Sequence, residues 1–351
     1  MQTEKKSQNS PSVRCAIIGL GMGKFHFEGY AQAEGATVVA VADLQEERLL
    51  PYKEKLGAEA CFTDYRKMLE TVQPDLVSVA LPNRLHEEVT LAALEGGAHV
   101  LCEKPMAMNV EQARRMREAA RKHDRQLGIN LNQLYSGKAE TLKEWISNDN
   151  LGEIYHGFTC WTRQDGIPGF GGWFGQKAMS GGGPLIDLGV HRLAVALWLM
   201  GDPEPERVVG YTHHHFGLPR AKAEGKPFDV EDFAAGSIRF KNGASLFLEA
   251  SWDGFQAKRD KIEMRLQGSR GALEDLGEMV HFGRSGAVFH QSLLTPKQPA
   301  FATSYDAMVQ SLRGGEPFRG TPERGIAIQQ ILDALYRSAG EGREAAVNGM
   351  E

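Results

Sequence analysis

The amino-acid sequence predicts a doubly wound α/β domain, followed by an α+β domain with an open, mostly antiparallel sheet. Three observations predict this. Up to about residue 130, short β-rich runs alternate with helical patterns, as in a series of β-α-β units. Those runs are continuously apolar, which is typical of parallel strands covered on both faces. From about residue 150, β-rich runs follow one another across short polar or glycine-containing turns, which favours antiparallel strands.

The first part contains five predicted strands with helical patterns between them. The strands are "VRCAIIG" at 13–19, "TVVAVAD" at 37–43, "DLVSVAL" at 75–81, "AHVLC" at 98–102 and "QLGIN" at 126–130. The helical patterns lie at 24–34, 46–56, 64–72, 85–97 and 109–124. We expect a polar, disordered tail at 1–12, a first domain at 13–133 and a second domain at 134–351. A ligand is expected beyond the carboxyl ends of the strands, where this kind of sheet binds one.

The second part contains strands that share one sheet. They are "EIYHGFTCWTR" at 153–163, "RVVGYTHHHF" at 207–216, "DFAAGSIRF" at 232–240, "ASLFLEASW" at 244–252 and "KIEMRLQG" at 261–268. Helices are predicted near 187–200, 302–313 and 322–338, on one side of the sheet, and the last of them can pack back on the first domain. The face of the second sheet without helices would then be exposed to solvent unless another surface covers it. Apolar residues such as Phe247 and Trp252 predict a sheet-to-sheet contact between copies, in a dimer or tetramer.

Composition excludes several classes of protein. The formal net charge is −5 without a long basic run, so nucleic acid is not an expected partner. The longest apolar run, at 193–200, is too short to cross a membrane. The four cysteines are distant from one another, which predicts reduced thiols in a cytoplasmic protein; they are Cys15, Cys61, Cys102 and Cys160. In "HHH" at 213–215, strand geometry separates the middle ring from the other two, so no metal site is predicted.

A glycine cluster follows the first strand. "IIGLGMGKFH" places Gly19, Gly21 and Gly23 between a strand and a helix, where glycines allow a tight turn and close approach of a pyrophosphate. The usual G-x-G-x-x-G spacing has its third glycine at position 24, which is Lys24 here. Asp43 ends the second strand and can bind both hydroxyls of an adenosine ribose, which favours NAD over NADP. A plain turn, and a helix-capping role for Asp43, are the alternatives.

The other predicted cofactor contacts lie at the same edge of the sheet. In "ALPNRLHEE", Pro82 and Asn83 follow a predicted strand and are expected at this edge. His86 begins the next helix, and a capping or packing role is preferred for it. The complete predicted cofactor set of this Rossmann domain is Gly19, Gly21, Met22, Gly23, Lys24, Asp43, Pro82, Asn83, His86, Glu103 and Lys104.

Several motifs in order resemble the Gfo/Idh/MocA oxidoreductase family. They are "GLGMGKFH", "VAVAD", "DLVSVALPNRLHEEVTLAALEGGAHVLCEKPMA", "LGEIYHG", "SGGGPLIDLGVH", "EDFAAGSIRFKNG" and "GSRGALE". The resemblance covers nearly the whole chain after residue 12. It implies that Lys104 of "EKP" approaches both the nicotinamide and the substrate hydroxyl, and that the bond to Pro105 is often cis. It further implies that Asp187 and His191 complete the catalytic site. Where the family often has an acid three residues after this histidine, the chain has Ala194.

The expected substrate is a small polyhydroxy compound. Predicted substrate-binding residues are Lys104, Asn130, Gln133, Tyr135, Arg163, Trp173, Asp187 and His191, with Trp161 as a further wall. The predicted function is an NAD-dependent dehydrogenase of a sugar, sugar acid or cyclitol. An NAD-using glycosidase that acts by transient oxidation and a non-enzymatic dinucleotide sensor are the alternatives. The choice of base between Lys104 and His191 stays open at this point.

Overall fold

The first sheet confirms the predicted doubly wound domain. The computed structural model describes residues 11–274, 279–284, 287–292 and 299–347, so residues 1–10 of the predicted tail lie outside the described residues. The strands are β1 (Val13–Ile18), β2 (Ala36–Ala42), β3 (Cys61–Phe62), β4 (Leu76–Val79), β5 (His99–Cys102) and β6 (Leu127–Ile129). They are all parallel, in the order β3-β2-β1-β4-β5-β6. This order places a crevice between β1 and β4, where the winding reverses.

Helices cover both faces of this sheet. They are α1 (Leu20–Gln32), α2 (Glu46–Leu56), α3 (Tyr65–Val72), α4 (His86–Glu95) and α5 (Val110–Lys122). The strands between them are buried, with Ile17, Val77 and Leu101 fully inaccessible to solvent. The continuous apolar runs in the sequence therefore reflect burial on both faces. Only β3 was not predicted, because a two-residue edge strand has no readable pattern.

The second sheet confirms the predicted α+β domain and is larger than predicted. Its order is β14-β13-β12-β11-β7-β10-β9-β8-β15, and β7 and β10 pair in parallel within an otherwise antiparallel sheet. The strands are β7 (Ile154–Arg163), β8 (Pro205–His213), β9 (Phe233–Phe240), β10 (Ser245–Ser251), β11 (Asp260–Gly268), β12 (Gly271–Glu274), β13 (Met279–Arg284), β14 (Ala287–Gln291) and β15 (Ala345–Ala346).

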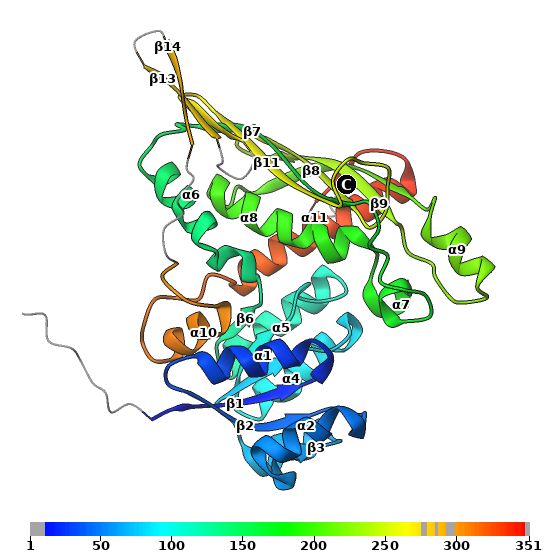
Figure 1. The fold of residues 1–351 in the computed structure, drawn as a ribbon. Coiled ribbons are helices and arrows are strands. Elements are labelled where there is room, and N and C mark those ends of the chain that lie inside the picture. The colour runs from blue at the N-terminus through cyan, green and yellow to red at the C-terminus, as the bar shows by residue number, and fades with distance from the viewer. Residues whose placement is uncertain (1–10, 275–278, 285–286, 293–298, 348–351) are drawn as a thin grey trace, which may run out of the picture.

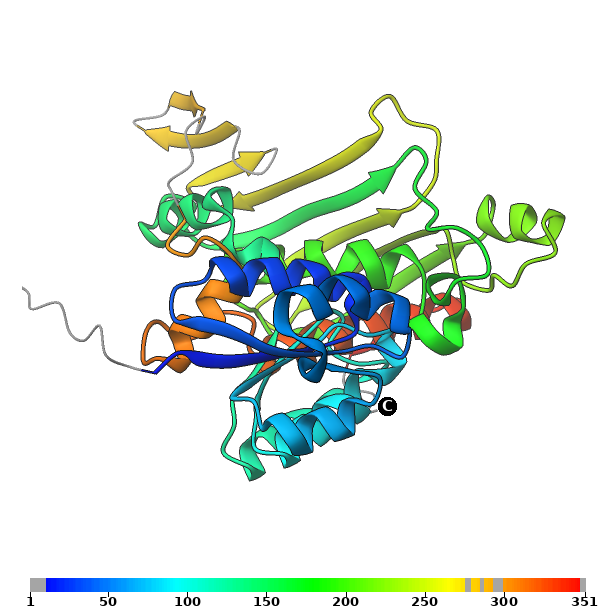
Figure 2. The same ribbon diagram turned by 60° about the horizontal axis from the view of Figure 1, so that its bottom comes forward.

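The helices of the second domain are α6 (Gly137–Ser147), α7 (Lys177–Ser180), α8 (Val190–Met200), α9 (Gly217–Ala223), α10 (Ser304–Leu312) and α11 (Pro322–Glu341). Of these, α6, α8 and α11 lie on one side of the sheet (Figure 1). Figure 2 shows the strands running side by side above them. α11 packs against both β8 and α5, and α10 packs against α1, so the C-terminal helices do return to the first domain.

The two faces of β10 differ sharply. Leu246, Leu248 and Ala250 are buried toward the helices, whereas Phe247 on the opposite face is 48% exposed. Trp252 continues the buried series and is 0% exposed. The expectation that Trp252 belongs to the open face with Phe247 is therefore wrong, because residues two apart on a strand share a face.

One helical stretch, Lys177–Met200, is long and apolar enough to cross a membrane by length and composition. Within its most apolar window, 78% of the residues are buried inside the protein. This is the environment of a core helix, and it agrees with a soluble protein.

Candidate active site

The three glycines after β1 have three different surroundings. Gly19 has φ +90°, and a Cβ there would lie 2.4 Å from the backbone oxygen of Ala80. A Cβ on Gly23 would lie 2.8 Å from a side-chain carbon of Ile17, so this glycine lets α1 pack on β1. At Gly21 the nearest atom is Arg48 Nη1, at 3.6 Å, which leaves room for a ligand. The close-packing glycine is thus present, although Lys24 occupies its usual position in the motif.

The carboxylate of Asp43 orders this loop. Its Oδ2 accepts a hydrogen bond from the backbone N–H of Leu20 at 2.7 Å, and its Oδ1 accepts one from Gln45 N at 2.9 Å. Arg48 Nη1 lies 3.4 Å from the same Oδ2. A carboxylate oxygen can accept more than one bond, so Asp43 can still receive ribose hydroxyls. The glycine loop, the amino end of α1 and Asp43 together fit the pyrophosphate and adenosine ribose of a dinucleotide.

Lys104 and Asp187 meet across the two domains. The Lys104 Nζ donates hydrogen bonds to the backbone oxygen and to Oδ1 of Asp187, both at 2.9 Å. Asp187 Oδ2 accepts a third bond, from the indole N–H of Trp252 at 3.0 Å. The peptide bond between Lys104 and Pro105 is cis. Burial raises the pKa of Asp187, but the charge and hydrogen bond of Lys104 and the bond from Trp252 outweigh it, so the net direction is down.

His191 lies one helical turn after Asp187. Its Nδ1 is buried and has no hydrogen-bond partner among the residues that the structure describes. Burial, and then the positive charge of Lys104, lower the pKa of His191 well below its usual value. The imidazole is therefore neutral near pH 7. The Nδ1 atom is itself inaccessible to solvent, so it is an unsatisfied buried polar atom of the protein.

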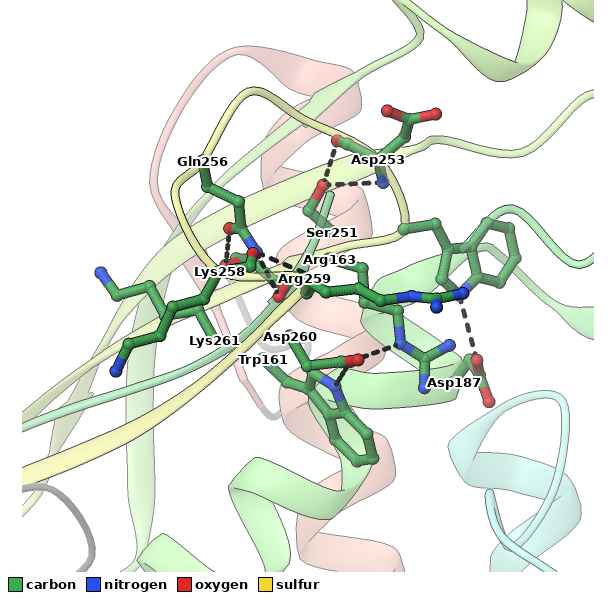
Figure 3. Close-up of polar contacts among 12 residues, drawn as sticks. Trp161, Arg163, Asp187, Ser251, Asp253, Gln256, Lys258, Arg259, Asp260 and Lys261 are labelled. Atoms are coloured by element: carbon green, nitrogen blue, oxygen red, sulfur yellow. Dashed lines mark hydrogen bonds and ion pairs between the residues drawn. The ribbon is translucent and has the colours of Figure 1, made fainter. Parts of the chain in front are cut away.

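An aromatic wall stands beside this histidine. The rings of Trp161 and His191 are 5.8 Å apart. Figure 3 shows Trp161 and Arg163 meeting at Asp260, whose Oδ1 accepts from the indole N–H and from Arg163 Nε, both at 3.1 Å. The guanidinium of Arg163 lies 5.1 Å from the centre of the indole ring. The indole ring of Trp161 is therefore held by Asp260 and by Arg163 before any ligand binds.

A cleft runs from the glycine loop to Asp187. It is lined by Met22, Ala80, Leu81, Asn83, Glu103, Lys104, Pro105, Trp173, Phe174, Ser180, Gly182, Ile186 and Asp187. Residues of both domains therefore line one continuous space, with the predicted cofactor edge at one end and the charged pair at the other.

Family models match both domains of the chain. Residues 13–131 match an oxidoreductase family with an NAD-binding Rossmann fold, and residues 139–274 match the Gfo/Idh/MocA C-terminal domain. The chain belongs to the Gfo/Idh/MocA oxidoreductase family. It is an oxidoreductase with an NAD-binding domain, as the sequence motifs predicted.

Two relatives and one solved structure are similar to this chain over nearly their full lengths. It is 34% identical to the D-glucoside 3-dehydrogenase of Escherichia coli, over 96% of this chain and 98% of that protein. It is 27% identical to the myo-inositol 2-dehydrogenase of Thermotoga maritima, over 94% and 97%. The structure of GenD2 from gentamicin A biosynthesis in complex with NAD is 26% identical, with a TM-score of 0.80 and 99% of each chain covered.

Some of the predicted cofactor residues form hydrogen bonds with other parts of the protein. His86 is buried, and its ring nitrogens lie 2.8 and 2.9 Å from the carbonyl oxygens of Pro105 and Leu81, which agrees with the packing role. The amide of Asn83 donates to the carbonyl of Ser180 at 2.7 Å and ties the two domains together. Lys24 is exposed, with Nζ 4.9 Å from the ring of Phe25. Pro82 precedes a short helical turn at Asn83–Leu85.

Five predicted substrate residues do not line the cleft: Arg163 and His191, which are described above, and Asn130, Gln133 and Tyr135. Asn130 is buried and donates to Glu103 at 2.6 Å. The amide oxygen of Gln133 accepts from Arg192 at 3.0 Å. The hydroxyl of Tyr135 accepts from the backbone of Arg319 at 2.7 Å. The structure thus gives the last three of these side chains partners within the protein, whereas it places Trp173 in the cleft wall.

Two contributors were missed in the sequence. Trp252 holds Asp187, and the buried series Leu246, Leu248, Ala250 along β10 was the available signal for its inward direction. Glu231 accepts from the backbone N–H groups of Gly183 at 2.9 Å and Leu185 at 3.2 Å. No local pattern reveals the contact of Glu231 with this segment, because Gly183 lies 48 positions before it in the sequence.

Proposed function

We propose that this oxidoreductase oxidises a secondary alcohol of a sugar, sugar acid or cyclitol with NAD. The observation that carries the proposal is the contact between Lys104 and Asp187 in a cleft that is also lined by Met22 of the dinucleotide loop. The two curated relatives described above are named as dehydrogenases of a glucoside and a cyclitol, which supports this substrate class.

Lys104, His191 and Asp187 have different proposed roles toward the reacting hydroxyl. An ammonium has three N–H donors, and Lys104 uses two of them on Asp187. The third can donate to the substrate oxygen and stabilise negative charge as it develops. The neutral imidazole of His191 is the proposed acceptor of the hydroxyl proton. Bound NAD supplies the acceptor for the hydride. Asp187 orients the ammonium through two of its oxygens.

The predicted preference for NAD over NADP rests on Asp43. Its carboxylate lies where an adenosine ribose is expected and would repel a 2′-phosphate. Arg48 lies 3.4 Å away and moderates this charge. The expected result is a higher kcat/KM with NAD, which kinetics with both cofactors would measure.

The substrate wall is assigned to Trp161, Arg163 and Trp173. Aromatic faces suit the C–H faces of sugar rings, and the guanidinium offers donors to hydroxyls. Trp173 stacks on Phe174 with ring centres 3.9 Å apart, so the second wall is also pre-formed.

We further propose a cytoplasmic homo-oligomer. On the face of the large sheet without helices, Phe247 and Tyr211 are 48% and 58% exposed. A second copy of the same face would cover both aromatics, as an isologous contact.

A panel of glycosides, free sugars, sugar acids and cyclitols with NAD tests the proposed activity. Net NADH formation with at least one of them is the expected result. Glycoside cleavage with NAD retained would assign the glycosidase reaction instead. Tight NAD binding without turnover of any compound would contradict the enzymatic proposal and favour a sensor.

A further inference from the structure

A buried hydrogen-bonded chain lies directly behind the catalytic lysine. His26 on α1 is 0% exposed. Its Nε2 lies 2.8 Å from Oε1 of Glu103, and its Nδ1 lies 2.9 Å from the hydroxyl of Ser78 on β4. The hydroxyl of Tyr30, one turn further along α1, lies 2.7 Å from the same Ser78 oxygen.

The carboxylate of Glu103 is the centre of this chain. Besides His26, its Oε1 accepts from the amide of Asn130 at 2.6 Å. Its Oε2 accepts from the backbone N–H of Lys104 at 3.2 Å. The other end of the Asn130 amide accepts from Ser304 at 2.6 Å, so its NH₂ faces Glu103. Residues from α1, from the end of β6 and from α10 therefore fix the residue that precedes Lys104.

The direction of each bond follows from the groups involved. An ionised carboxylate only accepts, so His26 Nε2 donates to Glu103. Nδ1 accepts from Ser78 in the neutral ring and donates to it in the imidazolium, whose charge also stabilises the Glu103 carboxylate. Burial raises the pKa of Glu103, but the hydrogen bond and charge of His26, the bond from Asn130 and the charge of Lys104 bring it down to about 2. The carboxylate stays ionised throughout the working pH range.

We propose that His26 and Asn130 are positioning residues for Lys104, which act through the Glu103 carboxylate to fix the distance between the catalytic ammonium and the bound dinucleotide. This inference rests on the proposed dehydrogenase function. The helix α1 connects the dinucleotide loop with the hydrogen bonds around Glu103. It begins at the glycine loop and carries His26 about two turns later. Hydride transfer is sensitive to such distances, since a displacement of about 1 Å can cost about 100-fold in rate.

The dependence of kcat on pH reports directly on the hydrogen bonds around Glu103. The titratable groups around Glu103 come from α1, the end of β5, α4, α8 and α10; they are His26, Tyr30, Lys104, His86, His191 and Tyr305. When a donor to Glu103 is removed, the pKa of its carboxyl rises. The acid limb of kcat should then move toward neutral pH, which loss of packing alone would not produce.

The test compares His26→Leu, which removes the donor, with His26→Gln, which keeps an N–H donor near the Nε2 position. His99→Leu is the matched control, because His99 is a half-buried histidine at the far end of β5 that accepts from Gln126 N at 2.8 Å. For each variant, kcat is divided by the number of sites that bind NADH in a fluorescence titration, and kcat is measured against pH.

We expect His26→Leu to lower kcat per site by about 10-fold or more, with KM for NAD changed by less than about 3-fold. His26→Gln should recover most of the loss, and the acid limb should shift only in His26→Leu. Equal losses in His26→Leu and His26→Gln, an unshifted acid limb, or a loss of the same size in His99→Leu would each overturn the proposal.

Asn130→Asp is a second variant, and it decides the matter if His26→Leu does not fold. It sets a second carboxyl against Glu103, so the acid limb should again move to higher pH and kcat should fall. An Asn130→Asp profile that matches the wild type would overturn the proposal. Absence of turnover by the wild type on every polyhydroxy compound would instead remove the proposed function on which the inference rests.

Discussion

At the scale of single residues, Asp187 joins the parts of the site. It accepts hydrogen bonds from Lys104 of the first domain at two oxygens and from Trp252, which directly follows β10, at the third. All three of its oxygens are therefore used before a substrate binds. The proposed role of Asp187 is therefore to orient the ammonium of Lys104, which acts on the substrate oxygen in the proposed reaction. The division of roles follows from counting donors and acceptors.

Asp43→Ser should shift cofactor preference toward NADP. The change removes the negative charge, leaves a hydroxyl that can accept from Leu20 N, and leaves Arg48 in place to bind a 2′-phosphate. The ratio of kcat/KM for NAD to that for NADP should fall by about 10-fold or more, which is ~1.4 kcal/mol. Adding Arg48→Ala should abolish the gain with NADP. An unchanged ratio in Asp43→Ser would contradict the role of this carboxylate.

Glu103→Gln should lower stability in a pH-dependent way. The folded pKa of Glu103 is about 2 and its ordinary value is 4.5, so the ionised group stabilises the fold above about pH 4.5 and this contribution is lost as pH falls toward 2. The difference between wild type and variant should be ~3 kcal/mol at neutral pH. Urea unfolding at several pH values measures it. A difference that does not shrink between pH 5 and pH 3 would refute the assignment.

Residue identities in motifs were readable from the sequence, and distant partners were not. "EKP" and "DLGVH" singled out Lys104, Asp187 and His191, and the structure brings the first two into contact. His26 and Trp252 were missed because their partners lie 77 and 65 positions away. Asn130, Gln133 and Tyr135 were predicted as polar substrate contacts, since nothing local shows that their polar groups have partners inside the protein.

At the scale of elements, the segment that carries Asp187 has a specific cap. Leu185–Gly189 forms a wide helical turn of the π type that leads into α8, a feature frequent at functional sites. Glu231 accepts from Gly183 and Leu185 at its amino end, and from the hydroxyl of Tyr336 on α11 at 2.7 Å. The triple glycine permits this, because a Cβ on Gly183 would lie 2.1 Å from the backbone oxygen of Glu231.

Glu231→Ala should therefore destabilise the protein by ~3 kcal/mol or more, because buried donors to a carboxylate lose their acceptor. Tyr336→Phe removes one of the three bonds and should cost ~1–2 kcal/mol. Denaturant unfolding of both variants provides the measurement. If Glu231→Ala costs no more than Tyr336→Phe, the capping role is wrong.

Elements with a long periodic pattern were predictable, and short or irregular ones were not. The strands β1, β2, β4, β5 and β6 of the first sheet and the helices α10 and α11 were predicted close to their observed positions. α6, α9 and the strands β12, β13 and β14 were not, because they are short or carry no clear apolar period. The π-type turn depends on contacts with Glu231 and has no signature of its own.

At the scale of the whole molecule, the site exists only because both domains contribute to it. The sequence predicted both fold classes, since alternation of elements and of apolar residues is a local property. It did not predict that β7 and β10 pair in parallel, because these strands are far apart in the chain and nothing local records their partners.

The exposed aromatic residues on the face of the large sheet without helices predict that copies of the chain associate through it. Phe247→Glu would bury charges in a contact between two copies, so it should convert an oligomer to a monomer. Leu50→Glu is the matched control, because Leu50 is 57% exposed on α2 of the other domain. Light scattering at micromolar concentration measures both. A monomeric wild type, or an unchanged mass for Phe247→Glu, would refute this interface.

The central claim is that Lys104 acts on the reacting oxygen. A surface lysine in an exposed ion pair contributes little, whereas a positioned donor at the reacting atom contributes much more.

Steady-state kcat of Lys104→Ala on the best substrate of the panel, with NAD binding measured alongside, tests this claim most directly. The expected result is a loss of about 100-fold or more in kcat, with NAD affinity changed far less because the glycine loop and Asp43 are intact. Lys104→Arg should not restore turnover, because a planar guanidinium cannot replace the compact ammonium against Asp187. Near-normal turnover by Lys104→Ala would contradict the account.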